Sequence, residues 1–114
     1  MFLKKKFPHF QQLDQMDCGP TCLKMIAKHY GKALSVQYLR QEAHIDRQGV
    51  SLLGISDAAE KVGFRTMAVK ASYETLAEEQ PFPCIAHWNQ NHFVVVYAIK
   101  KDKVYVADPG SSLI

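Results

Sequence analysis

Cys18 carries the side chain in this sequence with the clearest chemical potential. It stands in the run QQLDQMDCGPTC, directly before a segment with helical signals. Pro20 suits the first turn of a helix, which would place Cys18 at the helix N-terminus. The positive end of the helix dipole favours the thiolate there, and the thiolate is the attacking species. Because a single cysteine is more often part of a core than catalytic, the assignment depends on a base and an acid.

The sequence offers five histidines as that base: His9, His29, His44, His87 and His92. His29 and His44 are expected at helix ends, where a cationic ring complements the dipole, and His9 lies in an irregular lead-in. His92 opens an apolar strand and Asp108 closes the next, so antiparallel pairing would bring both to one end of a sheet. We therefore expect His92 as the base and Asp108 as its orienting carboxylate. His87 is the rival, ranked second because no carboxylate follows it at comparable spacing.

The pairing register decides whether His92 can reach Asp108. A loop with an odd number of residues, for instance three over 100–102, would set Val94 opposite Asp108. His92 would then be the diagonal neighbour of Asp108 on the same face. An even loop would place the two side chains on opposite faces of the sheet. We expect the odd loop and a contact between the two residues.

Three helices are expected to support this site, over 20–31, after Ser35 and after Ser51 up to Gly63. Their inward positions share apolar character at helical spacing: Leu23, Ile26, Ala27 and Tyr30 on the first, Val36, Leu39 and Ala43 on the second, and Leu52, Ile55, Ala59 and Val62 on the third. Such amphipathic stripes are typical of helices packed on a core.

After the third helix the pattern changes to that of strands. Residues 64–70 are expected to form a short strand and residues 72–79 a helical turn or two. Three further strands, over 84–88, 92–99 and 103–108, are expected to form an antiparallel meander. Because helices come first and strands second, the fold class is α+β, with the opening helix packed on the sheet. The apolar middle strand is expected to be covered on both faces.

Composition limits the class of protein. The 114 residues suit one domain, and 47% hydrophobic with 22% charged residues is ordinary globular composition. A net charge of +3 is well short of the basic balance of nucleic-acid binders, and three cysteines argue for reduced thiols. No apolar run suits a membrane span or a signal sequence, so we expect a soluble piece that starts in the cytoplasm. The lysines at 4–6 and the row Lys24, Lys28 and Lys32 are interpreted as solvated, with a weakly acidic peptide partner as the alternative.

Three runs resemble the double-glycine leader peptidases, the papain-like peptidase domains at the N-terminus of bacteriocin-exporting ABC transporters: QLDQMDCGPTCLKMIAKHYGK, GVSLLGISDAAEKVGFRT and HFVVVYAIKKDKVYVADPG. The resemblance covers nearly the whole chain. It implies the following roles: Gln12 in the oxyanion hole, Cys18 as nucleophile, His92 as general base and Asp108 as orienting acid. A Gln amide and the backbone N–H of Cys18 could supply the donors that a developing oxyanion needs. Gln11 and Gln15 are nearby rivals, and only the family spacing selects Gln12.

The resemblance also implies a reaction and its partners. The thiolate would attack the carbonyl after a Gly-Gly or Gly-Ala pair that ends an amphipathic leader helix, removing the leader from a bacteriocin or similar precursor during export. The implied partners are that precursor peptide and the transmembrane and ATP-binding domains of a parent transporter, with the peptidase on the cytoplasmic face of a bacterial membrane. No nucleic acid and no cofactor are expected, since ATP belongs to the transporter's nucleotide-binding domain. Residues 1–114 are expected to be the peptidase domain, excised or C-terminally shortened from the larger protein, with a leader groove near the first two helices and 44–51.

Two other functions stay open. Cys18 and Cys22 at C-x3-C, with Cys84 and His87 at C-x2-H, could hold a structural zinc ion. The leading interpretation of Cys22 is instead a small buried hydrophobe. The second alternative is a non-catalytic domain that docks leader peptides, although the complete set of nucleophile, base and acid argues against it.

Overall fold

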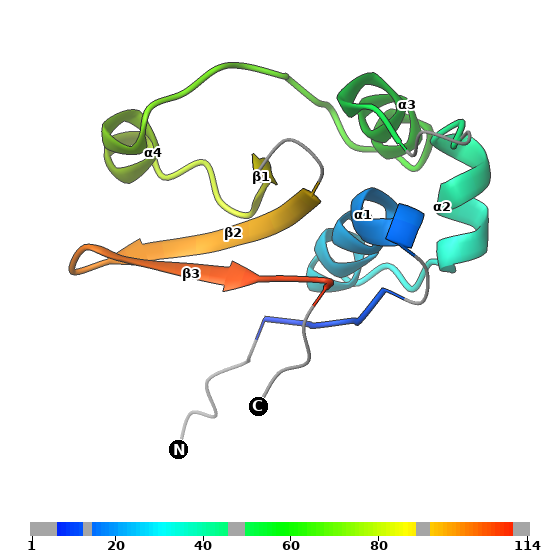
Figure 1. Ribbon diagram of the computed structural model, residues 1–114, viewed down its shortest axis with the longest axis horizontal. Coiled ribbons are helices and arrows are strands. Elements are labelled where there is room, and N and C mark those ends of the chain that lie inside the picture. The colour runs from blue at the N-terminus through cyan, green and yellow to red at the C-terminus, as the bar shows by residue number, and fades with distance from the viewer. Residues whose placement is uncertain (1–6, 13–14, 46–49, 89–91, 111–114) are drawn as a thin grey trace.

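The computed structural model describes residues 7–12, 15–45, 50–88 and 92–110. Its elements in chain order are η1 (Gln15–Asp17), α1 (Cys18–His29), α2 (Val36–Glu42), α3 (Leu52–Lys61), α4 (Tyr73–Glu79), β1 (Cys84–Trp88), β2 (His92–Lys100) and β3 (Lys103–Ala107) (Figure 1). Helices come first and strands second, and the α+β class is confirmed.

Helix α1 begins at Cys18, so Pro20 lies in its first turn as expected. It ends at His29, and Gly31 follows with φ +88°. A positive φ of this kind favours glycine and stops the helix. Tyr30 was expected to face inward, but it lies beyond the last helical residue and is 58% exposed. The chain has already turned away from the helical stripe at that point.

Helices α2 and α3 begin where their caps predict. Ser35 and Ser51 each accept a hydrogen bond from the backbone N–H three residues further on. Helix α3 is followed by Gly63 with φ +105°. The buried stripe of α3 runs through positions 54, 55, 58 and 59, so the expected inward residue Leu52 lies outside it and is exposed.

Helix α1 is the centre of the core (Figure 1). One cluster lies between α1 and the sheet and comprises Cys18, Cys22, Met25, Ile26, Ile55, Phe93, Val95 and Ala107. The other joins α1 to α2 and α3 and comprises Leu23, Leu39, Ala43, Ala58 and Ala59. The expected nucleophile therefore belongs to an element that is packed on two sides.

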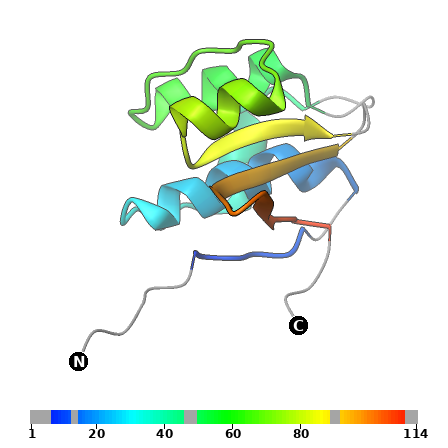
Figure 2. The ribbon, with the colours of Figure 1, turned by 90° about the vertical axis from the view of Figure 1, so that its left-hand side faces the viewer.

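The sheet is the expected antiparallel meander, with strand order β1-β2-β3. Residues 93–96 of β2 are all buried, which confirms a middle strand covered on both faces. Figure 2 shows the sheet from the side, with α1 running beside β2.

The connection between β2 and β3 differs from the expected odd loop. Lys100 pairs with Lys103, so the turn contains only Lys101 and Asp102. Both turn residues have positive φ, 51° and 63°, as in a type I′ hairpin turn. The loop is even, and the expectation of an odd loop is wrong.

A β-bulge compensates for the even turn. On the turn side Ala98 pairs with Tyr105, but on the site side Val96 pairs with Val106, so one residue of β2 is extra between these pairs. From there the register runs on to Val95 opposite Ala107. If this register is continued by one residue, Val94 lies opposite Asp108.

The expected strand over 64–70 is absent; this segment is irregular. Phe64 packs against both core clusters, whereas Met67 is 85% exposed. The apolar residues after Phe64 suggested a strand, but they are not hydrogen-bonded into the described sheet. Helix α4 forms as expected, capped by Ser72, and no residue of α4 is buried (Figure 1).

Of the lysine row, Lys28 and Lys32 are exposed as expected, whereas Lys24 is half-buried. Lys24 Nζ lies 4.2 Å from the centroid of the Phe10 ring, a cation–π distance. Lys32 Nζ donates to the Val62 carbonyl at 2.6 Å. Lys24 on α1 thus contacts the segment before η1, and Lys32, which follows α1, contacts the C-cap residue of α3. The lysines at 4–6 lie outside the described residues.

Candidate active site

Cys18 is the first residue of α1 and is 5% exposed. The glycine after it allows the helix to start deep in the core: a Cβ on Gly19 would lie 2.6 Å from Val50 Cγ1 and 2.9 Å from Ile55 Cδ1. The sequence Cys-Gly thus places a thiol and its backbone N–H at a closely packed helix N-terminus. This is the position that the sequence predicts, and the role of nucleophile remains a prediction.

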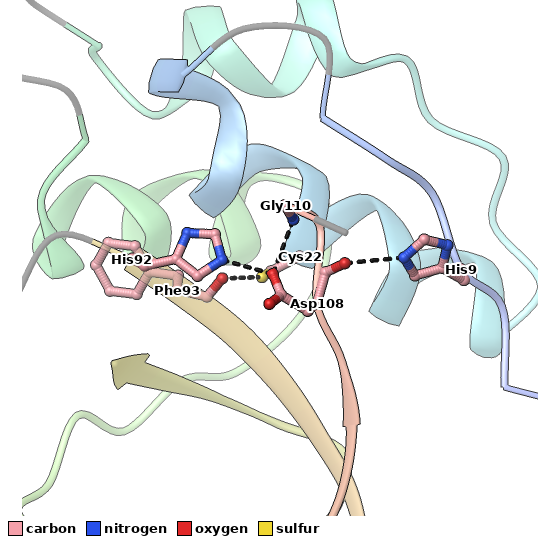
Figure 3. Close-up of polar contacts among 6 residues, drawn as sticks. All are labelled: His9, Cys22, His92, Phe93, Asp108 and Gly110. Carbon is pink, nitrogen blue, oxygen red and sulfur yellow. Dashed lines mark hydrogen bonds and ion pairs between the residues drawn. The ribbon is translucent and has the colours of Figure 1, made fainter. Parts of the chain in front are cut away.

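His92 and Asp108 are in contact, as the strand pairing predicts. His92 Nε2 lies 2.5 Å from Asp108 Oδ1, and Gly110 N–H donates to the same oxygen at 2.8 Å (Figure 3). Since the carboxylate engages Nε2, proton transfer with a thiol would use Nδ1. The pair has the geometry of a base with its orienting acid, as a cysteine peptidase requires.

The surroundings of Asp108 favour its ionised form. Burial alone would raise the pKa of this carboxyl, but the hydrogen bonds from His92 and Gly110 and the charges of His92 and His9 together lower it below its ordinary value. An ionised Asp108 can hold the His92 ring and stabilise its cationic form.

Residues 7–12, the lead-in segment, form hydrogen bonds with the backbone of Asp108 and Pro109. His9 Nε2 lies 2.8 Å from the backbone oxygen of Asp108 (Figure 3). Gln12 N–H donates to the Pro109 carbonyl at 2.7 Å. Gln12 is half-buried with a buried side-chain oxygen, whereas its rival Gln11 is exposed. The oxyanion role of Gln12 stays a prediction. The sequence around His9 indicates no role for it, because nothing local points to a partner 99 residues away.

Cys22 is fully buried, as expected of a small hydrophobe, and it also makes a polar contact. Its thiol donates to the Phe93 carbonyl over 3.2 Å (Figure 3). Burial, with the nearby charges of Cys18 and Asp108, raises the pKa of Cys22 well above its ordinary value, so it remains a neutral donor. This contact ties α1, one turn after the expected nucleophile, to the residue that follows His92.

The other histidines have different surroundings. His29 lies in the last turn of α1, and His44 lies past α2 with Nε2 4.0 Å from Asp57 Oδ2. His87 stacks on Phe93 with ring centroids 4.5 Å apart. The histidine that contacts the Asp108 carboxylate is His92.

The suggested zinc site is not formed. Cys18, Cys22, Cys84 and His87 are all among the described residues, and within these no three His, Cys, Asp or Glu side chains lie together as metal ligands would. The interpretation of the chain as a zinc module built on these four residues is therefore wrong.

Residues 6–114 match the sequence model of the peptidase C39 family. A curated relative, the lactococcin-G-processing and transport ATP-binding protein of Lactococcus lactis subsp. lactis, is 43% identical over 108 residues, which cover 90% of this chain and 15% of that protein. The colicin V secretion/processing ATP-binding protein of Escherichia coli is 33% identical over 110 residues, covering 96% of this chain and 16% of that protein. The chain thus spans a small part of the relatives it matches. In the described part of the chain, no helix combines the length and apolar character that crossing a membrane requires.

Solved structures with a similar fold point to the same kind of domain. A double glycine motif protease from an AMS/PCAT transporter, in complex with its leader peptide, superposes with a TM-score of 0.87 at 34% identity, covering 91% of this chain and 74% of that one. The peptidase domain of Streptococcus ComA gives a TM-score of 0.79 at 33% identity, covering 91% and 80%. The α+β arrangement of this chain is therefore papain-like, as expected.

Proposed function

The chain belongs to the peptidase C39 family of cysteine peptidases, and from this premise we propose that it removes leader peptides from ribosomally made precursors such as bacteriocins. The cut falls after a Gly-Gly or Gly-Ala pair, in step with export. The observation that carries the proposal is the contact between His92 and Asp108 at the site end of β2 and β3. A second supporting observation is that helix α1 begins at Cys18, the proposed nucleophile.

The proposed reaction uses four side chains. Cys18 gives its proton to His92, and the thiolate attacks the carbonyl carbon of the scissile bond while Asp108 holds the imidazolium. The backbone N–H of Cys18 and the amide of Gln12 donate to the developing oxyanion. When the tetrahedral intermediate collapses, the C–N bond breaks and His92 protonates the leaving amine. Water, activated by the same imidazole, then hydrolyses the thioester and releases the leader.

The proposed substrate class comes from the family resemblance, and shape gives it a physical reason. Glycines at the cut site fit a slot too narrow for a Cβ, and an amphipathic leader helix suits an apolar surface by its i, i+3, i+4 side chains. Large exposed apolar side chains are present at Leu53 on α3 and at Met67 and Val69 in the following segment. Such side chains are typical of docking surfaces when they lie together. The expected groove region over 44–51 is described only in part, because residues 46–49 lie outside the described residues.

The names of the relatives support the proposed partners. The matched proteins are named as transport and processing ATP-binding proteins, and this chain matches a small part of each. The proposal is that the domain works beside the transmembrane and ATP-binding domains of such a transporter, on the cytoplasmic face of the membrane. Its own reaction needs no cofactor.

The deciding experiment is cleavage of a synthetic precursor whose helical leader ends in Gly-Gly, read by mass spectrometry. We expect one cut, after the second glycine, and no cut by the Cys18→Ala variant. A precursor with both glycines replaced by valine should bind but resist cleavage. Binding of the Gly-Gly precursor without any cut would contradict the peptidase role and favour the docking domain.

A further inference from the structure

Asp17 is a buried acid directly before the expected nucleophile. Its side chain is 3% exposed, and it occupies the N-cap position of α1 without accepting a capping hydrogen bond from the helix. An N-cap aspartate ordinarily uses its carboxylate in that way. The carboxylate of Asp17 therefore serves some other contact.

That contact comes from helix α2. Arg40 Nε lies 2.9 Å from Asp17 Oδ1, and the Arg40 side chain is 40% exposed. Its neighbour Leu39 is fully buried in the core between α1 and α2, which anchors the backbone of Arg40. The ion pair thus joins α2 to the junction between η1 and α1.

Asp17 is the residue directly before Cys18, so the ion pair can act on the thiol through charge and through position. A carboxylate beside a thiol opposes formation of the thiolate, and a buried one does so with little solvent screening. A guanidinium on the carboxylate offsets that effect. The same contact fixes the chain one residue before the Cys18 backbone N–H, which the reaction uses as an oxyanion donor.

We propose that Arg40 is a positioning residue for the peptidase reaction: by pairing with Asp17 it cancels a negative charge beside Cys18 and fixes the start of α1. The proposal rests on the proposed function in that Cys18 is taken as the nucleophile. The alternative is that the ion pair only stabilises the fold. The two differ in what happens when both charges are removed together.

The test is the rate of Cys18 alkylation by iodoacetamide from pH 5 to pH 9, which needs no substrate, beside kcat and KM on the leader peptide. We expect Arg40→Gln to slow alkylation at pH 7 by about tenfold and to move the profile up by about one pH unit. Arg40→Lys should restore most of the rate. Asp17→Asn combined with Arg40→Gln should return the midpoint close to that of the unchanged protein, because the charge is gone. The ionisable groups Cys22, His92 and Asp108 near the start of α1 are the same in every variant.

Several outcomes would overturn the proposal. One is an unchanged alkylation profile for Arg40→Gln, and another is a double variant as slow as that single one, which would mean a scaffold only. If Arg40→Gln does not fold, Asp17→Asn alone tests the proposal. The guanidinium of Arg40 then has no carboxylate to pair with at position 17, and the pH profile of Cys18 alkylation should move to lower pH. No movement, or movement to higher pH, would contradict the proposal. Arg65→Gln, at an exposed arginine, is the matched control. Should the peptide not be cut at all, the proposed function fails while the alkylation result still stands.

Discussion

His92 Nε2 and Asp108 Oδ1 lie 2.5 Å apart, and three further hydrogen bonds involve the pair or the residue next to it. Gly110 N–H donates to the carboxylate, His9 contacts the Asp108 backbone oxygen, and the Cys22 thiol donates to the carbonyl directly after His92. The proposed base and acid are therefore held by contacts from α1, from the segment that carries His9 and from the segment after β3. Substitutions in any of these should change activity through position.

Asp108→Ala should lower kcat by roughly a hundredfold, because an unheld imidazole loses orientation and a stabilised cationic form. Cys18→Ala should cost more, since water can replace part of an orienting group but cannot replace the nucleophile. Steady-state kinetics on the Gly-Gly precursor measures both. Equal losses, or no loss for Asp108→Ala, would contradict the assignment.

Iodoacetamide should label Cys18 much faster than Cys22 or Cys84. Burial raises the pKa of Cys22, as do the charges of Cys18 and Asp108, and burial also raises the pKa of Cys84, so both thiols stay protonated near neutral pH. The thiol at the helix start has the dipole in its favour. Peptide mass spectrometry after timed labelling gives the three rates, and comparable rates in the folded protein would refute the prediction.

The ends of the helices could be predicted because their signals are local. Ser35, Ser51, Gly31 and Gly63 each act within one helical turn of their own position, and all four cap or stop a helix in the structure. The strand that was expected over 64–70 could not be tested by local signals of this kind. Alternation there resembled a buried face, but a strand also needs a partner, and the partner is a tertiary fact.

The contact between His92 and Asp108 was predicted through a loop length that is wrong. The turn is even, yet the bulge between Val96 and Ala98 shifts the register by one and brings the two side chains to one face. No residue type in β2 indicates that bulge in advance. The contacts of His9 and Cys22 were likewise beyond reach, because their partners lie 99 and 71 residues away.

Acid should weaken the folded state through Asp108. In the folded protein burial raises the pKa of Asp108, but the contacts with His92 and Gly110 outweigh burial and lower the pKa below its ordinary value of 3.8. The stability that Asp108 contributes is therefore fully present above pH 3.8 and is lost as the pH falls through the lower, folded-state pKa. We expect the thermal midpoint to fall less steeply below about pH 4 in Asp108→Asn than in the unchanged protein. Asp102→Asn is the control, since Asp102 is exposed in the turn. Parallel curves for all three proteins would show that Asp108 contributes nothing.

His9→Ala should reduce kcat by several-fold up to about tenfold, because one hydrogen bond that positions Asp108 is lost. His9→Gln, which keeps a donor, should recover part of the rate. His44→Ala, at an exposed histidine, should leave kcat unchanged. A full rate for His9→Ala would mean that the lead-in does not position the acid.

Gln12→Ala separates an oxyanion donor from a residue that only shapes the cleft. If the Gln12 amide acts as negative charge develops, its loss should lower kcat by about a hundredfold or more and leave KM nearly unchanged. The backbone bond from Gln12 N–H to Pro109 does not involve the side chain, so alanine should leave this tether in place. A loss confined to kcat would then belong to the amide itself.

Gln11→Ala is the internal control for that measurement. Gln11 has the same side chain one position earlier, but it is exposed where Gln12 is half-buried, and its loss should change neither constant by more than about twofold. If Gln12 instead only holds the lead-in, its substitution would raise KM or lower the thermal midpoint while kcat survives. Measuring both kinetic constants and the midpoint for the two variants decides between these, and a normal kcat for Gln12→Ala removes the oxyanion role.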